Sequence, residues 1–419
     1  MVLADTWCII ATQGNGRHNT TIVPYPVTRK RSETMSLSID SSYVRETLSD
    51  LVRINSVNPS LVAGAPGETE VANYVQQALD KMGLDVSRHE PVPGRPSVVG
   101  RLPGMGGSRS LMLNAHYDTV GVDGMDDPFS ATVRDGKLYG RGSYDMKGSL
   151  ASCLAAIKAL QDAGVGLAGD LYLAAVADEE HASIGTCDIL QHYEVTAAIV
   201  TEPTEMDICL AHKGFAWLEL EVFGRAAHGS RPDLGVDANM RMGRVLAHLE
   251  WLAEEMSGRV PHRLVGSPSL HAAMLRGGSG PSVYAASCKL TIERRTVPGE
   301  TEPQIVREIQ GILDELSSAD PGFKAELRTT LVRDPFEVAV DAPIVKHLER
   351  AIQKVTGEEP IHAGQTPWMD AALYAAAGID TVVIGPVGAG AHAGEEWVDL
   401  ATLDSLAHIL AETALEYCG

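Results

Sequence analysis

The chain has 419 residues and a formal net charge of −21, with 44% hydrophobic and 21% charged residues. This length favours two or more domains, and this composition excludes wholesale disorder. A chain so acidic has no general electrostatic attraction for nucleic acid or for an anionic membrane surface, so neither is expected as a partner. No apolar run reaches the length that spans a bilayer.

The cysteines and the first 34 residues indicate the cellular compartment of the protein. The six cysteines lie far apart without a CxxC pair, which favours reduced thiols in the cytoplasm over a disulfide framework or thiolate metal ligands. Residues 1–34 differ from the rest of the chain, and no basic segment precedes their short apolar stretch as a signal peptide requires. We expect residues 1–34 to be a disordered leader or an over-long start, and we assign them no function.

Helical and strand patterns alternate over the first half of the chain. A helical pattern starts at Ser42 and recurs over 71–82 and 148–163, and short apolar strands are expected over 110–115, 171–177 and 197–200. Such alternation predicts an α/β fold in which helices cover a parallel or mixed sheet.

The pattern then changes to that of a second domain. Strands are expected over 215–223, 269–276, 283–293 and 324–332, with helices over 237–256 and 305–316. The order β-α-β-β-α-β is that of a ferredoxin-like α+β unit, so we expect an inserted domain over 212–333. After this domain, the α/β pattern of the first half resumes, with helices expected over 342–356 and 367–377 and a strand over 381–384. The first domain is therefore expected to be discontinuous, with residues 35–211 and 334–419.

Acidic and imidazole side chains recur where the expected strands of the α/β domain end, or in glycine-rich loops. The set comprises His116, Asp118, Asp145, Glu179, Glu180, Glu202 and His392. Alone, each of these motifs is more often a structural or solvated group than a metal ligand. Together they place carboxylate oxygens and imidazole nitrogens at the carboxyl ends of strands of one domain, which predicts a shared metal centre.

In these motifs the chain resembles the M20 metallopeptidase and aminoacylase family, over about residues 40–417. That family includes acetylornithine deacetylases, succinyl-diaminopimelate desuccinylases and glutamate carboxypeptidases. The resemblance implies two divalent metal ions, with Asp145 bridging them. It implies that His116 and Glu202 complete one metal site, and that Glu180 and His392 complete the other. Zinc suits this donor set best, with cobalt or manganese as substitutes.

The resemblance also assigns residues that do not bind metal. Glu179 matches the general base, and Asp118 matches the partner that orients His116. The inserted domain resembles the family's lid and dimerisation domain, which implies a homodimer. In it, His228 matches a histidine that reaches the active site of the partner subunit. Arg295 matches the arginine that binds the substrate carboxylate, although a charge at an exposed strand end is an equally good reading of that residue alone.

Two segments depart from the family pattern, and both bear on the substrate. Ser282 stands nearest the position where many members have asparagine, and Met369-Asp370 stands where many have threonine-aspartate. The leading hypothesis is hydrolysis of the amide bond of a small N-acyl amino acid, of the acetylornithine deacetylase type. The alternatives are a dipeptidase or carboxypeptidase of the same fold, and a non-catalytic binding relative. That last class predicts loss of the base or of a ligand, and this chain retains them all.

Overall fold

The computed structural model describes residues 37–419. The expected leader, residues 1–34, lies outside the described residues. Within the described part, no helix is both long enough and apolar enough to cross a bilayer.

The larger of the two main sheets has nine strands and mixed direction. Eight strands follow the order β1-β2-β6-β3-β7-β15-β8-β13, and β14 pairs with β8. The central strands β6, β3, β7 and β15 pair in parallel, whereas β1, β2, β8 and β13 add antiparallel pairs. The bounds are β1 Asp85–His89, β2 Ser97–Leu102, β3 Ser110–His116, β6 Asp170–Val176, β7 Ala197–Val200, β8 Ile208–His212, β13 Phe336–Glu337, β14 His362–Gln365 and β15 Asp380–Val383.

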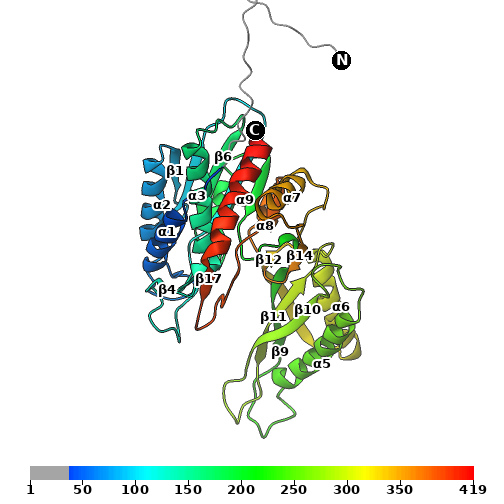
Figure 1. Ribbon diagram of the computed structural model, residues 1–419. Helices are drawn as coiled ribbons and strands as arrows, with labels where there is room; N and C mark the ends of the chain where they lie inside the picture. The colour runs from blue at the N-terminus through cyan, green and yellow to red at the C-terminus, as the bar shows by residue number, and fades with distance from the viewer. Residues whose placement is uncertain (1–36) are drawn as a thin grey trace, which may run out of the picture. The chain divides into compact units, whose positions relative to one another are not determined.

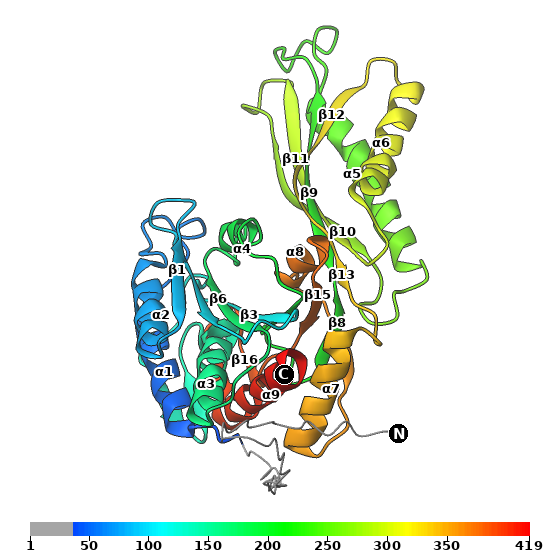
Figure 2. The ribbon, with the colours of Figure 1, turned by 90° about the horizontal axis from the view of Figure 1, so that it is seen from above.

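Helices cover both faces of this sheet, which explains why its central strands are mostly buried and apolar (Figure 2). One core joins the sheet to the five long helices of one face, and a second core joins the opposite face to two short helices. The long helices are α1 Ser41–Arg53, α2 Thr69–Lys81, α3 Gly148–Asp162, α7 Pro343–Thr356 and α9 Leu400–Cys418. The short ones are α4 Ile184–Ile189 and α8 Ala371–Ala376.

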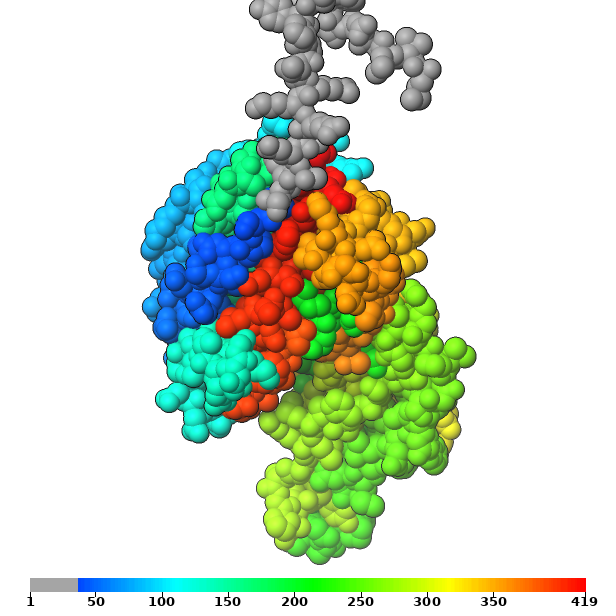
Figure 3. Space-filling model, viewed as in Figure 1, coloured from blue at the N-terminus to red at the C-terminus, as the bar shows by residue number. Residues whose placement is uncertain are grey.

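The last helix, α9, lies between α3 and α7 (Figure 1). In the space-filling view the red surface of α9 adjoins the orange surface of α7 (Figure 3). Asp399 caps the start of α9, because its carboxylate accepts hydrogen bonds from the backbone N–H groups of Ala401 and Thr402. The C-terminal segment is thus packed into the same layer as a helix from the first half of the chain.

The smaller unit contains a four-stranded antiparallel sheet with the order β10-β11-β9-β12. In β9, buried Leu218, Leu220 and Val222 alternate with the more exposed Glu219 and Glu221, so one face packs against helices and the other carries charges. The elements are β9 Gly214–Phe223, α5 Ala238–Ser257, β10 Ser269–Gly277, β11 Ser287–Thr296, α6 Glu302–Ala319 and β12 Lys324–Arg333. The order of these elements along the chain and the order of the strands in the sheet are those of the expected ferredoxin-like unit.

Most expected elements agree with the structure, and the deviations are local. The strand expected over 283–293 begins at Ser287, because residues 278–286 form a loop with an isolated bridge at Val283. The helix expected over 367–377 is reduced to α8. A further small sheet has the order β16-β17-β5-β4 and was not expected. Its strands are β4 Thr132–Arg134, β5 Lys137–Tyr139, β16 Gly388–Ala389 and β17 Trp397–Asp399.

Candidate metal centre and active site

Three neighbouring parallel strands bring four of the predicted residues to one edge of the large sheet. His116 is the last residue of β3, and Glu202 follows β7 by two residues. Glu179 and Glu180 lie in the turn that follows β6. Since β3 pairs in parallel with both β6 and β7, their carboxyl ends meet at the same edge, where polar side chains converge in α/β folds.

Asp145 joins this group from a different kind of element. It lies in the segment η1 (Ser143–Lys147), where its own backbone is not helical, and this segment leads into α3 rather than ending a strand of the large sheet. Its two carboxylate oxygens face two imidazoles. Oδ1 lies 3.1 Å from Nε2 of His116, and Oδ2 lies 3.3 Å from Nε2 of His392.

Each of these imidazoles has a second carboxylate beside it. Nε2 of His116 lies 3.5 Å from Glu202 and 3.9 Å from Glu179. Nε2 of His392 lies 2.9 Å from Glu180. The five predicted ligands therefore form two overlapping groups that share Asp145, with Glu179 beside the first group.

The electrostatics of the cluster follow from crowded, buried charges. Burial, and then the charge of Glu202, raises the pKa of Glu179 well above its usual range. Burial and the charge of Asp145 raise the pKa of Glu180 to about 7. Hydrogen bonds with Asp145 and Glu180 raise the pKa of His392 to about 10. The cluster thus binds protons that its members would not hold in water, because several carboxylates share one dry site.

These properties fit a pair of divalent cations. Carboxylate oxygens and imidazole nitrogens are the donors that zinc, cobalt and manganese accept in proteins. Ligand atoms of His116, Glu179 and Glu202 lie within 4.8 Å of one another, as do those of His116, Asp145 and Glu180. Cations between these groups would replace the shared protons and neutralise the buried carboxylates.

Asp118 lies beside the imidazole of His116 and also contacts the turn that follows β6. The nearest partner of Nδ1 of His116 is the backbone carbonyl oxygen of Asp118, at 3.0 Å, while the Asp118 carboxylate lies 3.5 Å away. That carboxylate accepts hydrogen bonds from the backbone N–H of Glu179 at 3.1 Å and of Glu180 at 3.3 Å. It therefore orients the turn that presents both glutamates as well as the imidazole.

A buried network behind this turn could not be found from motif spacing. Arg95 donates two hydrogen bonds of 2.6 Å to the carboxylate of Glu68 and one of 2.7 Å to Asp178. The amide of Asn58 donates hydrogen bonds to Asp178 and to Asp118, at 3.0 Å and 2.8 Å. These residues come from separate segments of the chain, so no sequence motif joins them. Arg95 and Asn58 together hold the carboxylate of Asp178, the residue that precedes Glu179.

Met369 and Asp370 are both buried near the site. Met369 is part of the apolar core that also contains α8. The carboxylate of Asp370 is fully buried and accepts a 2.5 Å hydrogen bond from the hydroxyl of Thr186 in α4. Burial raises the pKa of Asp370 to about 6.

His228 and Arg295 have local partners within the described chain. Nδ1 of His228 lies 2.8 Å from the hydroxyl of Ser230, and the side chain is exposed. Arg295 pairs with Glu293 and lies over the ring of Phe215, 5.3 Å from its centroid. Among residues 37–419, no hydrogen bond or ion pair links either residue to the cluster around Asp145.

The fold and this donor set define a metal-dependent hydrolase. Residues 112–416 match peptidase family M20/M25/M40, and the chain belongs to this family. It is 28% identical over 409 aligned positions to the N-formyl-4-amino-5-aminomethyl-2-methylpyrimidine deformylase of Halalkalibacterium halodurans, covering 89% of this chain and 95% of that protein. It is 29% identical over 391 positions to the acetylornithine deacetylase of Myxococcus xanthus, covering 90% and 98%.

Solved structures share the fold at lower identity. Aminopeptidase PepT from Bacillus cereus superimposes with a TM-score of 0.75 at 18% identity, covering 91% of this chain and all of that chain. The YXEP protein of Bacillus subtilis, described as a dinuclear metal binding peptidase of the M20 family, gives a TM-score of 0.70 at 16% identity, covering 90% and 99%.

Proposed function

We propose that this protein removes a small acyl group from an N-acyl amino acid by hydrolysing its amide bond. The observation that carries the proposal is the position of Asp145, whose two oxygens lie 3.1 Å and 3.3 Å from the imidazoles of His116 and His392. A carboxylate with one imidazole beside each oxygen is suited to bridge two cations.

The proposed ligands divide between two metal sites. His116 and Glu202 join Asp145 at one site, and Glu180 and His392 join it at the other. Zinc is the cation that we favour, with cobalt or manganese as substitutes. Such a pair of cations would polarise the scissile carbonyl group and lower the pKa of the attacking water.

Glu179 is the proposed general base. It would take a proton from the attacking water and return it to the nitrogen of the leaving amine. Its burial and raised pKa favour such a shuttle, since a carboxylate that holds a proton more tightly than a free one is a stronger base. Asp118 would hold Glu179 through its backbone N–H, as the 3.1 Å hydrogen bond indicates.

Two residues of the smaller unit complete the proposal. Arg295 would bind the substrate carboxylate, for which its guanidinium group offers paired donors. His228 would stabilise the oxyanion from the partner subunit of a homodimer. We further infer a reducing compartment such as the cytoplasm, because the five cysteines between residues 37 and 419 form no disulfide.

The names of the relatives favour deacylation over peptide hydrolysis. One is a deformylase and the other a deacetylase, so both release a small acyl group from an amine. A panel of N-formyl, N-acetyl and N-succinyl amino acids together with dipeptides tests this choice. The protein is first stripped of metal with a chelator and then reloaded with zinc, cobalt or manganese.

We expect no turnover by the stripped protein and restored turnover of N-acyl amino acids after reloading. Release of the free amine is followed by mass spectrometry. Faster cleavage of dipeptides than of every N-acyl amino acid would make the protein a dipeptidase. Full activity in the stripped protein, with metal shown to be absent, would overturn the two-metal proposal.

A further inference from the structure

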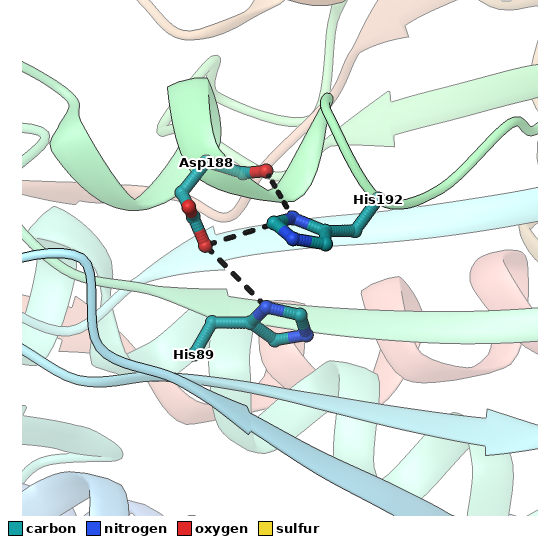
Figure 4. A group of neighbouring side chains, drawn as sticks. All are labelled: His89, Asp188 and His192. Carbon is teal, nitrogen blue, oxygen red and sulfur yellow. Dashed lines mark hydrogen bonds and ion pairs between the residues drawn. The ribbon is translucent and has the colours of Figure 1, made fainter.

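Two histidines and an aspartate form a second candidate ligand group in the large α/β unit (Figure 4). His89 ends the edge strand β1, Asp188 lies in α4, and His192 follows α4 by three residues. None of the three belongs to the cluster around Asp145. The group therefore has no part in the proposed hydrolysis.

The side chains converge on one carboxylate. Oδ2 of Asp188 lies 3.4 Å from Nδ1 of His89 and 3.8 Å from Nδ1 of His192. The ring centroids of the two histidines are 5.0 Å apart, and their planes are inclined by 54°. One ligand atom from each residue lies within 4.8 Å of those of the other two, which is close enough for all three to bind a single ion.

Neighbouring oxygens fix the orientation of both rings. The hydroxyl of Tyr193 lies 2.9 Å from Nε2 of His89, and the backbone carbonyl oxygen of Asp188 lies 2.8 Å from Nδ1 of His192. A metal-binding histidine usually has such an oxygen partner on its other ring nitrogen, which here leaves Nδ1 of His89 and Nε2 of His192 as the nitrogens that could bind an ion.

The donor set selects the class of cation. Two imidazole nitrogens and one carboxylate oxygen suit zinc and its neighbours among the divalent transition metals, whereas magnesium and calcium prefer oxygen alone. The side chains of His89 and Asp188 are 14% and 19% exposed, and that of His192 is 52% exposed. The group is thus open on one side, which leaves access for the ion and room for water as a further ligand.

We propose that His89, Asp188 and His192 bind a divalent transition-metal ion, with zinc as the favoured one, at a site separate from the catalytic centre. Its ligands join α4 to the edge of the nine-stranded sheet. Since α4 begins at Ile184, just after the turn that contains Glu179 and Glu180, the ion would stabilise the segment that leaves this turn.

Metal stoichiometry of the full-length chain tests the site. Wild-type protein, His192→Ala and the control His408→Ala are stripped with a chelator, equilibrated with zinc and analysed by mass spectrometry for bound metal. His408 is a partly exposed histidine of α9 that belongs to none of the three-residue ligand groups. We expect wild type and His408→Ala to bind one more equivalent of zinc than His192→Ala.

Turnover measurements separate this site from the catalytic one. His192→Ala should keep the wild-type kcat once it is saturated with metal, because it retains the cluster around Asp145. Zinc should also raise the melting temperature of wild type by more than that of His192→Ala. Equal zinc stoichiometry in all three proteins would overturn the proposal. So would the absence of an anomalous zinc peak between the three side chains in crystals of the loaded wild-type protein.

Discussion

The backbone N–H of Asp145 donates a 3.0 Å hydrogen bond to the carboxylate of Glu396. The same carboxylate accepts hydrogen bonds from the N–H groups of Gly142 and Tyr144, at 3.0 Å and 2.9 Å, and from Arg141 at 2.6 Å. Glu396 is 1% exposed. One buried carboxylate therefore holds the whole loop that presents the central residue of the candidate metal centre.

Replacing Glu396 with glutamine should weaken the centre without removing a ligand. The amide NH2 would face donors that now meet an acceptor, so the Asp145 loop should shift. We expect metal affinity to fall by about 10- to 100-fold, the usual effect of losing a partner that orients a ligand. Competition with a chromogenic chelator measures the affinity. The matched control is Glu395→Gln at the exposed neighbouring residue, which should behave like wild type. A wild-type affinity in Glu396→Gln would show that this carboxylate does not position Asp145.

Glu179→Ala should separate proton transfer from metal binding. We expect metal content near that of wild type and a kcat that falls by roughly 10²–10⁴, the usual contribution of general acid–base catalysis. Glu180→Ala is the comparison and should lose metal as well as activity, because Glu180 lies 2.9 Å from the imidazole of His392. Should Glu179→Ala lose metal instead, the roles of the two glutamates have been exchanged.

A mixing experiment tests whether His228 acts across a dimer. Inactive His228→Ala is combined with inactive Glu179→Ala under conditions in which subunits exchange. A mixed dimer would have one site with both residues intact, so up to about a quarter of wild-type activity should return at equal mixing. Exchange is followed by energy transfer between labelled subunits. If subunits exchange and no activity returns, His228 acts within its own chain, where it now contacts Ser230, or has no catalytic role.

His212 should make stability depend on pH. Burial lowers its pKa from 6.5 to about 4. Between these values the unfolded chain binds a proton that the folded chain does not, so the free energy of unfolding should decrease as the pH falls from about 6.5 to about 4. The loss from this residue approaches about 3 kcal/mol, at about 1.4 kcal/mol per pH unit. Urea unfolding of metal-free wild type and His212→Phe measures it. The variant should show the weaker pH dependence, and parallel curves would contradict the prediction.

Arg95→Met should destabilise the fold strongly. It leaves the carboxylates of Glu68 and Asp178, which are 0% and 1% exposed, without their cation. Removing one partner of such a buried group costs about 3–5 kcal/mol. Arg231→Met is the matched control, since Arg231 also binds a carboxylate through two nitrogens but does so on the surface, and it should change stability little. Similar urea midpoints for the two variants would show that the Arg95 network is not essential for stability.

The long elements could be predicted from the sequence because their periodicity extends over many residues. In β9, buried and more exposed residues alternate over ten residues, and α6 repeats its apolar face over 18 residues. The strands β13 and β16 have two residues each, which is too few for a period to be visible. The four-stranded sheet that contains β16 was missed for this reason.

Candidate site residues at strand ends could be predicted from the sequence, but the residues that support them could not. His116 and Glu202 follow apolar runs that mark β3 and β7. Glu68 and Arg95 lie 27 positions apart in segments without a shared motif, and only the fold joins them. Glu396 stands four residues after His392 in the sequence. That spacing does not indicate the four hydrogen bonds that its carboxylate accepts.

The position of β15 in the large sheet has a consequence for biosynthesis. This strand lies between β7 and β8, although the whole of the smaller unit separates it from them in the chain. As the ribosome extends the polypeptide, β9 to β12 can pair with one another before residues 380–383 have emerged. The gap between β7 and β8 stays open until then, and His392 emerges later still. The ferredoxin-like unit can thus fold during translation, whereas the proposed second metal site, to which His392 belongs, is complete only when synthesis is nearly finished.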